Sequence, residues 1–62
     1  MVGYGFFFIR SDKKLPDFDL ADYPDDEGAL AAARALLESR SQAEEVEVIR
    51  GETLVGRLAR ER

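Results

Sequence analysis

Residues 25–40 read DDEGALAAARALLESR, a run built largely from alanine, leucine and other strong helix formers. At 3.6 residues per turn, its small and apolar side chains fall on one stripe, while charged residues and further alanines fall on the opposite side. The stripe consists of Ala29, Ala33, Leu36, Leu37 and Arg40, with Leu30 and Ala32 at its edges. The pattern predicts a helix over about residues 25–40 that packs through one face.

The start of this helix is marked by its flanking residues. Pro24 disfavours helical backbone at Tyr23, so the helix begins after it. Asp25 or Asp26 can then act as the N-cap, because a short carboxylate accepts hydrogen bonds from the free N–H groups of the first turn. Both aspartates remain candidates for the cap.

Two short segments before the helix are typical of β-strands. Residues 4–10, YGFFFIR, are aromatic and β-branched, and successive side chains of a strand point to opposite faces. Tyr4, Phe6 and Phe8 therefore share one face, and Phe7 and Ile9 share the other. With two apolar faces, this strand is expected inside the sheet. Residues 15–21, LPDFDLA, predict a second strand that either lies at an edge of the sheet or begins after Pro16, because Pro16 cannot donate a ladder hydrogen bond.

Two further strands follow the helix. Residues 45–50 read EVEVIR and residues 53–58 read TLVGRL, with a tight turn between them. A two-residue loop pairs Ile49 with Leu54 and Val48 with Val55, whereas a bulged loop pairs Val48 with Leu54. Both registers remain open.

The element order ββαββ predicts an α+β fold for a single domain spanning residues 1–62. Hairpins and one crossover helix suit a four-stranded antiparallel sheet with the helix on one face. Because the helix returns the chain beside the first strand, the expected strand order is 2-1-3-4.

Composition narrows the possible functions. The 62-residue chain has no cysteine or histidine and a net charge of −4. It therefore lacks disulfides, thiolate ligands and the usual catalytic bases, and its acidity argues against nucleic acid or anionic membrane as a partner. No run reaches the roughly 18 apolar residues that span a bilayer, so we expect a cytoplasmic protein. So small a core is marginal alone, which favours a homo-oligomer, with a dimer preferred.

Two local patterns suggest chemistry but fit it poorly. Carboxylates crowd residues 17–27 as in calcium loops, yet Asp22 stands where the turn glycine belongs and Gly28 where the closing glutamate belongs. Residues 3–6, GYGF, resemble part of an RNA-binding strand motif, yet Val2 replaces its basic residue. We expect no metal, no cofactor and no catalytic residue, and hence no enzymatic activity.

Residues 24–37, 46–51 and 54–58 resemble a group of short uncharacterised bacterial ββαββ proteins. The proteins of this group share with the chain an aromatic first strand, an acidic-capped alanine-rich helix and an LVGRL-type last strand. The resemblance implies no activity. The chain is more faintly similar to HicB-type antitoxin domains, which also place a strand pair before such a helix.

The expected function is therefore a small non-enzymatic module that self-associates. The alternative is an antitoxin-like or regulatory domain that binds a partner protein. One helix can cover only one face of the first strand, so the other face is expected at the oligomer interface. That interface contains either Phe7 and Ile9, or Tyr4, Phe6 and Phe8.

Overall fold

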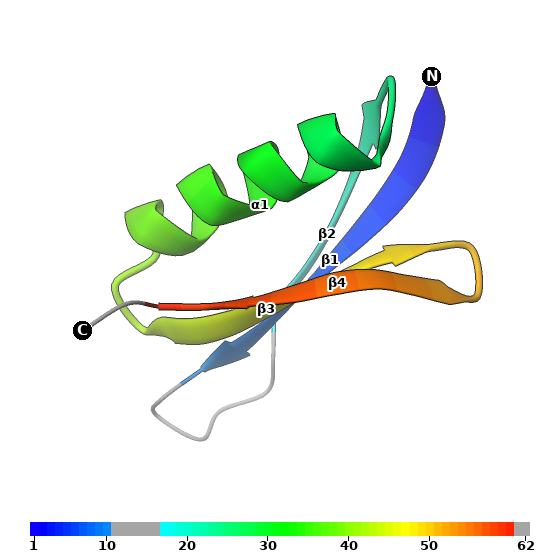
Figure 1. Cartoon of the computed structure of the whole chain (residues 1–62). Coiled ribbons are helices and arrows are strands. Elements are labelled where there is room, and N and C mark those ends of the chain that lie inside the picture. The colour runs from blue at the N-terminus through cyan, green and yellow to red at the C-terminus, as the bar shows by residue number, and fades with distance from the viewer. Residues whose placement is uncertain (11–16, 61–62) are drawn as a thin grey trace.

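A computed structural model describes residues 1–10 and 17–60 of the chain. The elements are β1 (Val2–Arg10), β2 (Asp17–Tyr23), α1 (Asp26–Ser39), β3 (Ala43–Arg50) and β4 (Thr53–Ala59). The strands form one antiparallel sheet in the order β2-β1-β3-β4, and α1 lies across one face of it (Figure 1). The predicted α+β fold and strand order are confirmed, with β1 inside the sheet.

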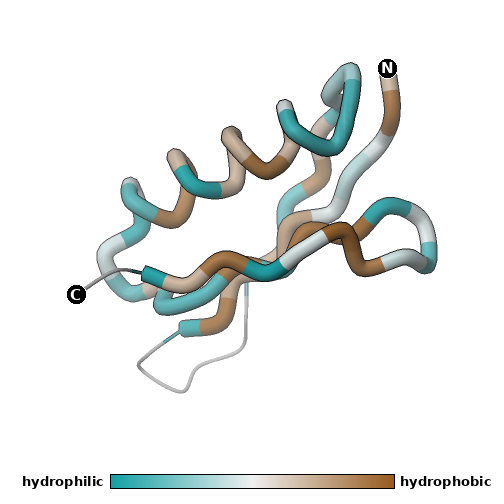
Figure 2. The backbone as a smooth tube through the Cα atoms, in the orientation of Figure 1, coloured by the Kyte–Doolittle hydropathy of each residue, from teal (hydrophilic) through white to brown (hydrophobic). Residues whose placement is uncertain are grey.

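The core lies between α1 and the inner face of the sheet. Tyr4, Phe6 and Phe8 fill it from β1, and Phe6 and Phe8 are fully buried. The helix contributes mainly small side chains, so its backbone can approach the large rings closely. Figure 2 shows hydrophobic and hydrophilic residues alternating turn by turn along α1, as its amphipathic stripe requires. The rest of the buried core consists of Ala29, Ala33, Leu37, Ala43, Val46 and Val48.

The first hairpin differs from its predicted limits. β1 begins at Val2 rather than Tyr4, and β2 ends at Tyr23 rather than Ala21. The two ends belong together, because Val2 pairs with Tyr23 and Gly3 pairs with Asp22. Tyr23 also packs edge-on against Phe6, with ring centroids 5.9 Å apart, which is a tertiary contact that local sequence does not reveal. The first residues of the predicted second strand, 15 and 16, lie outside the described residues.

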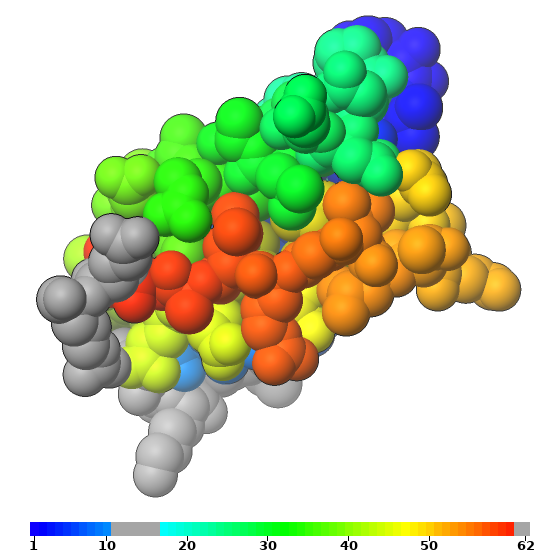
Figure 3. Space-filling view, viewed as in Figure 1, coloured from blue at the N-terminus to red at the C-terminus, as the bar shows by residue number. Residues whose placement is uncertain are grey.

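The second hairpin follows neither predicted register throughout, because Val48 pairs with neither Val55 nor Leu54. Ile49 pairs with Leu54, as in the two-residue loop, but Val48 then pairs with Gly56, so the ladder bulges at Val55. Gly51 occupies the turn at φ 61°, a left-handed conformation that glycine adopts readily. The bulge turns Leu58 toward the core, and α1 passes close over β4, where the Leu30 side chain lies against Gly56. Figure 3 shows α1 and β4 in direct contact along this side.

Candidate functional site

The outer face of the sheet, opposite α1, carries an uncovered group of apolar side chains. Alternation along each strand places them there, and the pairing register aligns them in rows. In one row Leu20, Gly5, Ile49 and Leu54 lie side by side, and in the next Phe18 lies beside Phe7. Leu20 is 77% exposed, Leu54 54% and Phe18 52%. We call Phe7, Ile9, Phe18, Leu20, Ile49 and Leu54 the outer apolar face.

Only one of the two predicted interface sets is available at the surface. Phe7 and Ile9 point outward and are half-buried, while Tyr4, Phe6 and Phe8 are buried beneath α1. The Phe7 ring packs edge-on against Phe18, with ring centroids 6.2 Å apart. The structure therefore brings Phe7 together with two β2 residues, Phe18 and Leu20, that the sequence analysis did not assign to an interface. The alternation of Phe18 and Leu20 with aspartates along β2 was the signal that could have identified them.

Charge divides this face into two halves. On β1 and β2, the two outward-facing pairs Gly5–Leu20 and Phe7–Phe18 contain no charged side chain. Over β3 and β4, Arg57 donates a 3.0 Å hydrogen bond to Glu47 and lies 4.0 Å from Glu45. The hydrogen bond to Glu47 raises the pKa of Arg57 above its ordinary value, so the guanidinium keeps its charge. The outer apolar face thus has a dry half over β1 and β2 and a charged half over β3 and β4.

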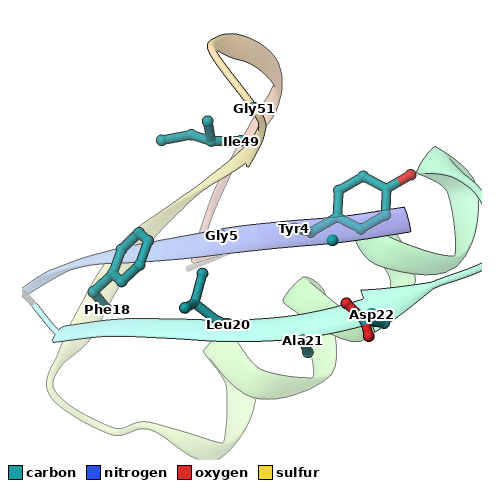
Figure 4. Close-up of a pocket in the computed structure, with 9 residues that line it drawn as sticks. Tyr4, Gly5, Phe18, Leu20, Ala21, Asp22, Ile49 and Gly51 are labelled. Atoms are coloured by element: carbon teal, nitrogen blue, oxygen red, sulfur yellow. The ribbon is translucent and has the colours of Figure 1, made fainter. Parts of the chain in front are cut away.

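A hollow of about 580 Å³ opens on the outer face where β1 and the turn of the second hairpin separate. Phe18, Leu20 and Ile49 surround Gly5 there (Figure 4), and Gly3 also lines the hollow. The Phe18 ring lies so close over Gly5 that an added Cβ there would be only 2.8 Å from the ring. The hollow is therefore mainly apolar, with Asp22 also in its lining, and no side chain enters it from Gly3 or Gly5.

A polar cluster joins α1 to the sheet at the start of the helix. The Tyr4 hydroxyl donates a 2.7 Å hydrogen bond to Asp26, and Arg50 donates to both carboxylate oxygens of Asp26, at 2.6 and 2.8 Å. Burial raises the pKa of Tyr4, and the hydrogen bond to Asp26 adds to this shift. The pKa of Asp26 is lowered, first by the Tyr4 hydrogen bond and then by Arg50. The groups satisfy one another, so the cluster fastens α1 onto β1 and β3.

The two candidate capping residues have separate roles. Asp25 is the N-cap, and its carboxylate accepts a 2.8 Å hydrogen bond from the Gly28 N–H. Asp26 lies in the first turn and serves the cluster with Tyr4 and Arg50 instead. The division follows from the backbone, because Asp25 is extended whereas Asp26 is already helical.

The end of α1 is held by two arginines whose roles the sequence analysis did not predict. The Arg40 guanidinium lies 4.4 Å from the centre of the Phe8 ring and binds Asp19 at 2.5 Å. Arg60 donates to the carbonyl oxygens of Leu37 at 2.7 Å and Ala43 at 3.0 Å, and also to that of Arg40. Free carbonyls at a helix end need such donors. These contacts join residues 17 to 32 positions apart in the sequence, so no local pattern could indicate them.

The acidic stretch does not assemble a metal site. Within residues 1–10 and 17–60, no group of three or more acidic side chains is arranged to hold a metal ion. Asp17 and Asp19 instead face Arg40, at 3.4 and 2.5 Å. These carboxylates pair with cations along the β2 edge, where charge also discourages pairing with another strand.

Comparison of the chain with protein-family models, curated proteins and solved structures gives no match. Among the helices described, none is long and apolar enough to cross a membrane.

Proposed function

We propose that the protein is a small non-enzymatic module that forms a homodimer through the outer apolar face of its sheet. The observation that carries this proposal is the exposure of large apolar side chains, Phe18, Leu20 and Leu54, on the one broad surface that α1 leaves uncovered. Contiguous apolar surface of this kind marks interaction sites.

The small size of the core favours a second copy of the chain as the partner. A domain of about 60 residues buries only about 60% of its unfolded surface, so its own core leaves little stability in reserve. Each large apolar side chain that becomes fully buried contributes roughly 1.5–3 kcal/mol. A two-fold axis applies every such contact twice, and for this reason isologous dimers are the commonest assemblies.

The absence of enzymatic activity is supported by how the polar residues are used. The chain has no histidine or cysteine. Asp25 caps α1, Asp26 binds Tyr4 and Arg50, and Asp19 binds Arg40. Each of these carboxylates thus has a structural partner, and the hollow on the outer face is lined by glycine and apolar side chains with Asp22 as its charged residue.

Leu20→Glu tests the proposal by placing a charge on the outer apolar face. Because Leu20 is 77% exposed, the substitution leaves the core intact. The matched control is Ala35→Glu, which adds the same charge on the exposed side of α1. Sedimentation equilibrium should show a folded monomer for Leu20→Glu and a dimer for Ala35→Glu. A Leu20→Glu protein as dimeric as its control would contradict the proposal.

A further inference from the structure

We draw no further inference here: the strongest candidate, the mainly apolar hollow beside Phe18, Leu20 and Ile49 on the outer face of the sheet, belongs to the outer apolar face already described, and nothing in the structure shows what covers it.

Discussion

Phe7 and Phe8 are adjacent in the chain but have opposite environments, so a matched pair of substitutions tests the two faces of β1. Phe8 is fully buried beneath α1, with the Arg40 guanidinium 4.4 Å from its ring centre. Removing a buried phenylalanine ring costs about 3–5 kcal/mol, including the cavity left behind. At roughly 0.05–0.15 kcal/mol per residue, the whole chain has a stability of about 3–9 kcal/mol. Phe8→Ala should therefore remove most of the free energy of unfolding.

Phe7→Ala should be much milder. Phe7 points outward, is half-buried and contacts Phe18. Its truncation should cost about 1 kcal/mol, a fraction of the roughly 1.5–3 kcal/mol for complete burial. Urea unfolding followed by far-UV circular dichroism measures both variants, at low micromolar concentration so that association contributes little. Equal losses, or a larger loss for Phe7→Ala, would refute the assignment of the inner and outer faces.

Three further predictions concern the ends of α1. Asp25→Ala removes the N-cap hydrogen bond and should cost about 0.5–2 kcal/mol, visible as a lower midpoint in a thermal melt; an unchanged midpoint would exclude Asp25 as the cap. The lowered pKa of Asp26 contributes stability at neutral pH that is lost as pH falls from about 4 through the folded-state value. Asp26→Asn should therefore weaken the acid dependence of the thermal midpoint, whereas Glu38→Gln on the exposed side of α1 should not; identical profiles would contradict the cluster. Arg60→Met leaves helix-end carbonyls without their guanidinium donor and should speed amide exchange in the last turn of α1, compared with Arg34→Met as a control; equal exchange would contradict the capping role.

The elements and their order could be predicted because the determining signals are local. Alanine and leucine at helical spacing define α1, and the apolar character of both faces of the first strand places it inside the sheet. The ends of the strands could not be predicted as well from the sequence. Val2 and Tyr23 are strand residues because they pair with each other, and the bulge at Val55 reflects packing of Leu58 on the core. Such pairings depend on residues far apart in the chain.

The candidate site could be predicted only in part from the sequence, for the same reason. Alternation shows that Phe7 and Ile9 share a face, but it cannot show which face α1 covers. The small helix residues Ala29 and Ala33 pack against the larger set of rings, which leaves Phe7 outward. The hollow could not be foreseen, because it depends on Leu20 and Ile49 flanking Gly5 from two different strands.

The oligomeric state of the wild-type chain tests the central proposal most directly. Multi-angle light scattering across a dilution series up to high micromolar concentration should give a mass that rises toward twice the 7.0 kDa of one chain. A mass of 7.0 kDa at every concentration would contradict self-association through the outer apolar face.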